Sequence, residues 1–262
     1  MGRFAGQGSA RGAAAVLLLL SWLAGCAGPE HEDPTEDMSA RQIYLEAKAE
    51  LEDGQYETAA GLYSKLISRY PYGRYAQQAL LEMAYAYYKG NETETAILTA
   101  ERFIKLYPRH PGIPYAYYLR GLAAYPMEPD FLARWFDQDP AERDPHAVRR
   151  AMDFFTALLD KFPRSKYTAD ARQRLLYLRG LLARHEIAVA RFYLRREAYV
   201  AAANRARRVI EEFPRTPAVA EALQVLVAAY EGLALPDLAR DARRVLELNY
   251  PPRAAGPQDE QG

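Results

Sequence analysis

The amino-acid sequence predicts an all-α protein, a right-handed solenoid of five helix pairs. Two observations lead to this fold class. First, an aromatic residue is followed by proline five times, at intervals of 37, 55, 51 and 37 residues. The dipeptides are Tyr70-Pro71, Tyr107-Pro108, Phe162-Pro163, Phe213-Pro214 and Tyr250-Pro251. Second, an alanine stands twelve residues before each of these prolines, at Ala59, Ala96, Ala151, Ala202 and Ala239. Agreement at fixed offsets indicates an internal repeat rather than coincidence.

Each repeat has the properties of two helices that need a neighbour. Proline cannot continue a helix and disfavours helical geometry in the residue before it, so each dipeptide is expected to close one helix. A second alanine stands eight residues after each of the first four prolines, at Ala79, Ala116, Ala171 and Ala222. Alanine lets two helices approach closely, and the apolar stripe of one pair can be buried only by the next pair. This pattern resembles the tetratricopeptide repeat at a slightly long period.

The predicted helix pairs span residues 41–70, 73–107, 112–162, 166–213 and 216–250. Two intervals exceed the 37-residue period. The 18 extra residues of the first (55 minus 37) match the proline-rich residues 126–145, which we expect to form an inserted loop. The 14 extra residues of the second (51 minus 37) fall in a stretch without proline, Lys166 to Glu197. Fourteen residues are nearly four helical turns, so we expect one helix of roughly 30 residues that projects beyond the solenoid.

The N-terminus has the layout of a signal peptide. Residues 1–25 carry two arginines, no acidic residue and 13 dominantly apolar residues, which is shorter than the about 20 that a membrane-spanning helix needs. The four residues that end at Cys26, LAGC, resemble the bacterial lipoprotein signal. We therefore expect Cys26, the only cysteine, to carry a covalent lipid that anchors the chain. Ala27, where some lipoproteins have aspartate, favours the outer membrane. An ordinary signal peptide that leaves a stray thiol is the alternative.

Composition and motifs do not favour an enzyme. Without residues 1–25 the chain has 32 basic residues (34 minus 2) against 34 acidic ones, a balance that argues against nucleic acid as a partner. No two of the four histidines stand at metal-ligand spacing. His185-Glu186 begins like a zinc-protease helix, but position 189 is Val189, so the second ligand is missing. We expect no catalysis, no metal and no cofactor beyond the lipid, and we interpret His185-Glu186 as a surface pair.

Tyrosine is concentrated in the first half of the chain. Of the 20 tyrosines, 12 lie between Tyr63 and Tyr125. One face of the helix expected after Pro71 shows Tyr75, Gln78, Glu82, Tyr85 and Lys89 at steps of three and four residues. In tetratricopeptide arrays, this first-helix face lines the concave groove. Aromatic rings with polar tips give a large contact area at low entropy cost, which suits an extended peptide. Plain solvated tyrosines remain the alternative.

The candidate peptide-binding residues are drawn from two neighbouring repeats. Tyr115 holds in the next repeat the place that Gln78 holds in this one, and Arg74 stands ready for a polar or carboxylate end of the peptide. The full set is Arg74, Tyr75, Gln78, Tyr85, Lys89 and Tyr115.

Several segments resemble the BamD family, outer-membrane lipoproteins of the β-barrel assembly machinery. The segments are RYPYGRYAQQ (69–78), AYAYYK (84–89), ERFIKLYPRHP (101–111), YLRGL (118–122), ERDP (142–145) and AYVAAANR (198–205). The resemblance spans essentially the whole chain after residue 25. It implies a non-enzymatic scaffold and substrate receptor, lipid-anchored at the periplasmic face of the outer membrane. Its implied partners are the barrel-forming subunit, other assembly lipoproteins and unfolded outer-membrane proteins.

Composition and the resemblance together divide the chain, with the tether and the tail following from composition and the roles of the repeats from the resemblance. Residues 26–40 would be an acylated, flexible tether, and residues 41–125 would be repeats that bind the β-signals of unfolded outer-membrane proteins. Residues 146–250 would dock on the POTRA domains of the barrel-forming subunit, and residues 251–262 would be a disordered tail. The family's partner-contacting arginine, at the end of the long helix, matches Arg196.

Two other classes of protein compete with this interpretation. A periplasmic repeat lipoprotein linked to peptidoglycan or to the Tol system would share the anchor and the repeats, but we expect it to lack the tyrosine-rich segments. A peptidase or transglycosylase accessory enzyme would need a constellation of reactive groups that the sequence does not supply.

Overall fold

The computed structural model describes residues 34–125 and 145–251, and the regular structure within them is entirely helical. The described helices are α2 (Ala40–Glu52), α3 (Tyr56–Arg69), α4 (Arg74–Lys89), α5 (Thr93–Leu106), α6 (Ile113–Ala124), α8 (Pro145–Lys161), α9 (Thr168–Arg195), α10 (Tyr199–Glu212), α11 (Ala218–Gly232) and α12 (Pro236–Asn249). They form the five predicted pairs, so the predicted fold class is confirmed. The signal segment, Cys26, most of the expected loop and nearly all of the expected tail lie outside the described residues.

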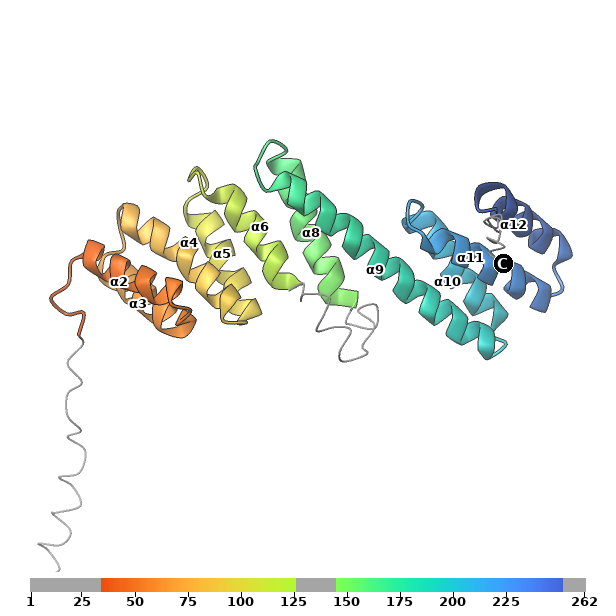
Figure 1. The fold of residues 1–262 in the computed structure, drawn as a ribbon, viewed down its shortest axis with the longest axis horizontal. Helices are drawn as coiled ribbons and strands as arrows, with labels where there is room; N and C mark the ends of the chain where they lie inside the picture. The colour runs from red at the N-terminus through yellow and green to blue at the C-terminus, as the bar shows by residue number, and fades with distance from the viewer. Residues whose placement is uncertain (1–33, 126–144, 252–262) are drawn as a thin grey trace, which may run out of the picture.

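The helices follow one another along the long axis of the molecule, each packed against its neighbours in the chain (Figure 1). Two kinds of turn alternate between them. The turns within a pair, which we call hairpin turns, comprise residues 53–55, 90–92, 196–198 and 233–235. The turns between pairs, which we call inter-pair turns, comprise residues 70–73, 107–112, 162–167 and 213–217. Because the pairs stack in register, the inter-pair turns lie along the upper edge in Figure 1 and the hairpin turns along the lower edge.

The repeated alanines lie where the helices are packed together. Eight of these nine alanines are completely buried, and the ninth, Ala239, is 3% exposed. A methyl group at these positions lets neighbouring backbones approach closely, so that larger apolar side chains can interlock around them. Leu66, Phe103, Leu158 and Val209, each five residues before a repeat proline, are also completely buried. The equivalent Leu246 in α12 is only half-buried, because no further described helix covers the last pair.

The aromatic-proline dipeptides end the second helix of each pair, as predicted. α3 ends at Arg69 and α5 at Leu106, one residue before the aromatic residue in each case. The aromatic residue itself still donates its backbone N–H to the helix, for example Tyr70 to the carbonyl of Leu66 at 2.8 Å. The proline that follows has no N–H to donate, so the helix cannot continue.

The longest helix, α9, has 28 residues against a prediction of roughly 30. It packs against α8, α10 and α11 and so connects the N-terminal and C-terminal halves (Figure 1). Glu186, near its middle, is only 2% exposed. The expectation of a surface pair at His185-Glu186 is therefore wrong for the glutamate. The reason is that α8 and α10 both cover the face of α9 that carries Glu186.

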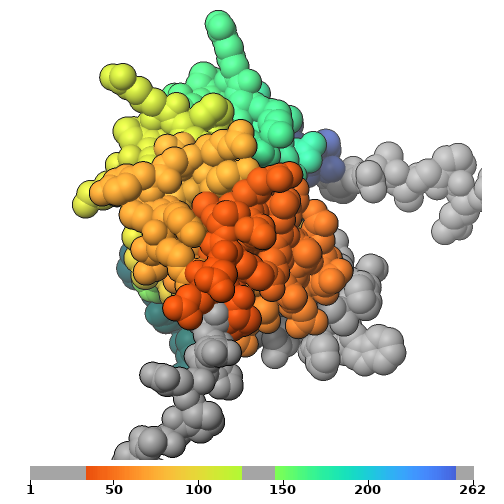
Figure 2. All heavy atoms as spheres, turned by 90° about the vertical axis from the view of Figure 1, so that its left-hand side faces the viewer, coloured from red at the N-terminus to blue at the C-terminus, as the bar shows by residue number. Residues whose placement is uncertain are grey.

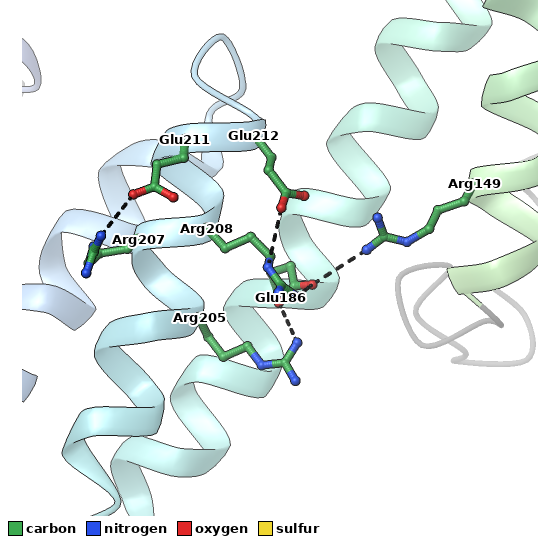
Figure 3. Close-up of polar contacts among 7 residues, drawn as sticks. All are labelled: Arg149, Glu186, Arg205, Arg207, Arg208, Glu211 and Glu212. Carbon is green, nitrogen blue, oxygen red and sulfur yellow. Dashed lines mark hydrogen bonds and ion pairs between the residues drawn. The ribbon is translucent and has the colours of Figure 1, made fainter.

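Three arginines from the two flanking helices surround the buried carboxylate (Figure 3). Arg205 and Arg208 of α10 lie 3.0 Å and 3.5 Å from it, and Arg149 of α8 lies 3.8 Å away. A buried carboxylate is costly unless it is paired and hydrogen-bonded, and these arginines supply that pairing. The cluster therefore joins α8, α9 and α10 at the point where the two halves of the solenoid meet.

We predict that Glu186→Gln lowers the free energy of unfolding by about 1–3 kcal/mol, because it removes the charge that the three arginines surround. The arginines are themselves half-exposed and can turn toward water, which limits the loss. Glu211→Gln is the matched control, since Glu211 is exposed and pairs with a single arginine, Arg207 at 3.2 Å, within the part of the chain that the structure describes. That change should cost about 0.5 kcal/mol or less. Urea denaturation measures both, and equal losses would contradict a special role for Glu186.

Candidate functional site

Two groups of tyrosines lie mainly on or just before the first helices of successive pairs. The N-terminal cluster consists of Tyr44 of α2, Tyr63 of α3 and Tyr75 of α4. The central cluster consists of Tyr85 and Tyr88 of α4, Tyr115 and Tyr118 of α6, and Tyr167 just before α9. Apart from Tyr63, which is completely buried, these rings are half-buried. Each half-buried ring therefore has one side fixed by packing and another side open to solvent.

The carboxylate of Glu82 organises the N-terminal cluster. It accepts hydrogen bonds from the hydroxyls of Tyr44 at 2.7 Å and Tyr63 at 2.5 Å, and from the side-chain amide of Gln78 at 2.8 Å. Burial, and then the hydrogen bond to Glu82, raise the pKa of both Tyr44 and Tyr63. Both hydroxyls therefore stay protonated and act as donors, which ties α2, α3 and α4 together.

Tyr75 extends this cluster toward solvent. Its ring lies 5.5 Å from that of Tyr44, in a tilted arrangement. The exposed Arg74 guanidinium lies 4.9 Å from the centre of the Tyr75 ring, and Arg74 donates a hydrogen bond to the Tyr75 hydroxyl at 3.1 Å. A phenol ring and a guanidinium are thus presented side by side at the start of α4.

The central cluster joins the third and fourth helix pairs through ring contacts, and Tyr85 and Tyr88 of the second pair are electrostatic neighbours of Tyr115. Tyr167 stacks on Tyr118 with ring centres 5.0 Å apart, and it also contacts Tyr115 at 5.4 Å. Burial raises the pKa of Tyr115, and the neighbouring hydroxyls of Tyr85 and Tyr167 raise it further. The Tyr115 hydroxyl therefore stays protonated and uncharged at the centre of the cluster.

A carboxylate also fixes the central cluster, as Glu82 fixes the N-terminal cluster. The Tyr118 hydroxyl donates to Asp170 at 2.5 Å, and Arg174 lies 2.5 Å from the same oxygen. Burial raises the pKa of Tyr118 to about 12, and the hydrogen bond to Asp170 contributes to that rise. Burial also tends to raise the pKa of Asp170, but the hydrogen bonds from Tyr118 and Arg174 outweigh it and hold that pKa below its ordinary value.

The structure brings most of the candidate peptide-binding residues together as a strip. Tyr75, Gln78 and Tyr85 share one face of α4, and Tyr115 of α6 adjoins Tyr85. Lys89 is the exception, because its ammonium group lies over the ring of Tyr56 at the start of α3, 5.8 Å from its centre. Arg74 and Lys89 are fifteen residues apart on one helix, or roughly 22 Å, so one carboxylate cannot contact both.

Sequence reasoning missed several residues of the two clusters. Tyr167 stands four residues before Ala171, as Tyr75 stands four before Ala79, so the repeat offset could have identified it. Asp170 stands one residue before Ala171 and so occupies the place of Tyr115 in the next repeat. No comparable signal pointed to Tyr44, because its helix has no repeat proline before it.

The expected partner residue, Arg196, lies at the far end of α9. It is exposed, and its guanidinium lies 4.6 Å from the centre of the Phe192 ring, a ring that is itself 43% exposed. The next residue, Glu197, has a φ of 58°, in the left-handed region that favours glycine. This conformation lets Ala198 donate its N–H to the carbonyl of Tyr193 at 3.0 Å and so ends α9. Arg196 and Phe192 together form an exposed cation–aromatic pair on the hairpin edge.

The described residues show neither a metal-binding group nor a helix suited to span a membrane. No group of three or more His, Cys, Asp or Glu side chains within residues 34–125 and 145–251 is placed to hold a metal ion. Over the same residues, no helix combines the length and the apolar character needed to cross a membrane.

The lowered pKa of Asp170 predicts how the central cluster responds to acid. Because the folded-state pKa lies below the ordinary value of 3.8, the stabilisation is fully present above about pH 5 and is lost as the pH falls through and below 3.8. Asp170→Asn should therefore cost about 1–2 kcal/mol of unfolding free energy near pH 7 and much less near pH 3. Asp160→Asn, at an exposed carboxylate, is the control and should change little at either pH. Urea denaturation at the two pH values measures this, and a pH-independent loss for Asp170→Asn would contradict the assignment.

Comparison with known proteins gives the family. The family model described as "Outer membrane lipoprotein" (YfiO) matches residues 36–246. The outer membrane protein assembly factor BamD of Neisseria meningitidis serogroup A is 46% identical over 217 residues, which cover 83% of this chain and 81% of that protein. The BamD proteins of Vibrio cholerae and Xylella fastidiosa strain Temecula1 are each 37% identical. The match to the Vibrio protein covers 89% of this chain and 96% of that protein. The match to the Xylella protein covers 91% of this chain and 81% of that protein. The chain therefore belongs to the BamD (YfiO) family of outer membrane lipoproteins.

Proposed function

We propose that this chain is a non-enzymatic scaffold and substrate receptor in the assembly of β-barrel proteins into the outer membrane. A lipid on Cys26 would hold it at the periplasmic face of that membrane, beside the barrel-forming subunit and other assembly lipoproteins. Its relatives are named as outer membrane protein assembly factors, and its family is described as outer membrane lipoproteins. The observation that carries the proposal is the strip of half-buried tyrosines from Tyr75 to Tyr115.

The strip has the dimensions and chemistry to bind an extended peptide. Tyr75 and Tyr85 are ten residues apart on α4, or about 15 Å, which is the length of four or five residues of a β-strand. Side chains on one face of a strand recur every two residues, so aromatic residues of a β-signal can lie among the rings of Tyr75, Tyr85 and Tyr115. The rings are pre-positioned by packing, so binding orders few side chains.

Charge and hydrogen-bonding groups at the edge of the strip complement such a ligand. Arg74 can pair with a carboxylate, including the C-terminus of an unfolded chain, while remaining on the Tyr75 ring. The phenol hydroxyls can donate to peptide carbonyls. Holding the substrate next to the lipid anchor raises its local concentration beside the barrel-forming subunit, and this step needs no nucleotide.

We predict that the double change Tyr75→Ala and Tyr85→Ala lowers crosslinking to a β-signal peptide at least ~5-fold, because two aromatic anchors of the strip are lost. The double change to Phe should retain most of the crosslinking, since the rings remain. Tyr250→Ala, at a partly exposed tyrosine next to the end of α12, is the control and should have no effect. Circular dichroism checks that helicity is intact. Undiminished crosslinking in the folded alanine variant would remove these two residues from the account.

For the partner, we propose that residues 146–250 dock on the POTRA domains of the barrel-forming subunit, with Arg196 in the contact. Arginine and exposed aromatic rings are the residue types that most often dominate protein interfaces. Arg196 and Phe192 supply both, at a helix end that projects from the solenoid (Figure 1).

Arg196→Glu should weaken co-purification with the barrel-forming subunit by ~10-fold or more, because it reverses a charge and removes the guanidinium from the Phe192 ring. Arg184→Glu provides the matched control, since Arg184 is exposed on the same helix. The control should co-purify as the parent chain does. If both variants behave like the parent, Arg196 is not part of the contact.

A further inference from the structure

The inter-pair turns form a basic edge on the solenoid. Residues 70–73, 107–112, 162–167 and 213–217 contain no aspartate or glutamate. They carry Arg109, Arg164, Lys166 and Arg215. The turns lie along one edge of the molecule, the upper edge in Figure 1, so these cations form a row. Figure 2, which views the N-terminal end, shows yellow-green and green side chains projecting above the body at this edge.

The opposite edge has a different charge pattern. Three of the four hairpin turns carry a carboxylate, at Asp53, Glu92 and Glu197. Only one hairpin turn carries a basic residue, Arg196. Exposed Lys89 and Arg195 end α4 and α9 at this edge, so the asymmetry lies in the turns themselves, and it makes the inter-pair turns the ones suited to an anionic surface.

The cations of the basic edge are available for a partner. Arg109, Arg164 and Arg215 are exposed, and none forms an ion pair with another residue in the described part of the chain. The ammonium of Lys166 lies 5.2 Å from the centre of the Tyr167 ring and is likewise exposed.

Nearby carboxylates leave most of this charge uncompensated. Glu211 and Glu212, at the end of α10, pair with Arg207 and Arg208 at 3.2 Å and 3.4 Å. Asp160, at the end of α8, is an exposed acidic neighbour of this edge. Glu36 and Asp37, just before α2, are two more. The four turns themselves therefore remain a source of positive potential.

The first inter-pair turn adds an exposed aromatic residue to this edge. Tyr72 is 91% exposed, the largest value among the exposed large hydrophobic residues of the described chain. Tyrosine, with an apolar ring and a polar tip, is enriched at membrane–water interfaces.

The position of the proposed anchor favours a membrane as the partner. Arg69 and Tyr70 hold the segment before α2: the Tyr70 hydroxyl donates to the carbonyl of Met38 at 2.8 Å, and Arg69 donates to that of Thr35. The chain thus approaches α2 alongside the first inter-pair turn. Thr35 lies nine residues after Cys26 (35 minus 26), and nine residue steps can span at most about 30 Å. A lipid on Cys26 would therefore keep the basic edge close to the bilayer.

We propose that the inter-pair edge is a membrane-contact surface for anionic phospholipids. Arg109, Arg164 and Arg215 pair with headgroup phosphates, and Tyr72 inserts at headgroup depth. This inference rests on the proposed lipid anchor: one lipidated site and a basic patch together give the two signals that stable membrane attachment requires. Tyr75 and Tyr115 lie near the starts of α4 and α6, on the same edge, so a bound substrate would be held next to the membrane.

The test uses the processed, full mature chain reconstituted in phosphatidylcholine vesicles, with or without about one-third phosphatidylglycerol and with a headgroup-quencher lipid. A fluorophore is placed on Pro111→Cys, at the basic edge, or on Asp53→Cys, at the opposite edge. We expect quenching at position 111 to exceed that at position 53 by ~3-fold or more with phosphatidylglycerol, and the difference to fall sharply without it.

Charge-reversal variants assign the effect to the edge. Arg109→Glu, Arg164→Glu, Lys166→Glu and Arg215→Glu combined should abolish the difference, since each charge near an anionic surface contributes roughly 5-fold in affinity. The control combination reverses four exposed basic residues elsewhere, Lys48, Arg184, Arg195 and Arg240, to glutamate and should retain the difference. Tyr72→Ala should reduce it.

The outcomes separate this inference from the anchor on which it rests. The parent chain is tested first for a free Cys26 thiol with the same fluorophore and by mass spectrometry, and a free thiol would contradict the anchor. Equal quenching at the two positions in chains whose Cys26 is lipidated would overturn the membrane-contact edge alone. Loss of the difference in the control combination would also overturn it, because net charge and not this edge would then be responsible.

Discussion

The fold depends on close contact between helices at alanine positions that recur in every pair. A helix pair cannot bury its own apolar stripe, so each pair needs the next, and the buried alanines set how closely they approach. At α12, which no further described helix covers, the apolar residues Leu238, Val245 and Leu248 remain exposed. The same constraint fixes the register of stacking. It therefore places all inter-pair turns on one edge and all first-helix faces on one side.

Because of this register, tyrosines that are far apart in the sequence lie close together on one surface. Tyr44, Tyr75, Tyr115 and Tyr167 come from four successive helix pairs, yet ring contacts link them in two clusters. A carboxylate fixes each cluster, Glu82 in the first and Asp170 in the second, by accepting hydrogen bonds from tyrosine hydroxyls. The rings that face solvent are thus held in place before any ligand arrives, which lowers the entropic cost of binding. A buried carboxylate with three arginines plays a similar structural part where the two halves meet.

The repeat could be predicted from the sequence because its signals are local and periodic. Proline offsets identified all five pairs, and the surplus over the period predicted the long α9 at roughly 30 residues, against 28 in the structure. The interactions that depend on residues far apart in the chain could not be predicted. Glu186 is buried only because α8 and α10 flank α9, and Tyr118 meets Asp170 across 52 residues. The direction of Lys89 depended on Tyr56, a residue of the preceding pair. Tyr167, by contrast, could have been predicted from the sequence, because it stands four residues before Ala171.

We propose that the open sides of the half-buried tyrosines receive an extended segment of an unfolded outer membrane protein. Nitration of tyrosines, followed by mass spectrometry with and without a C-terminal β-signal peptide, tests it at each ring. The peptide should protect Tyr75 and Tyr85 from nitration while leaving Tyr250 and the highly exposed Tyr72 as reactive as before. If a saturating peptide leaves the reactivity of Tyr75 and Tyr85 unchanged, the peptide does not bind on this face and the claim is wrong.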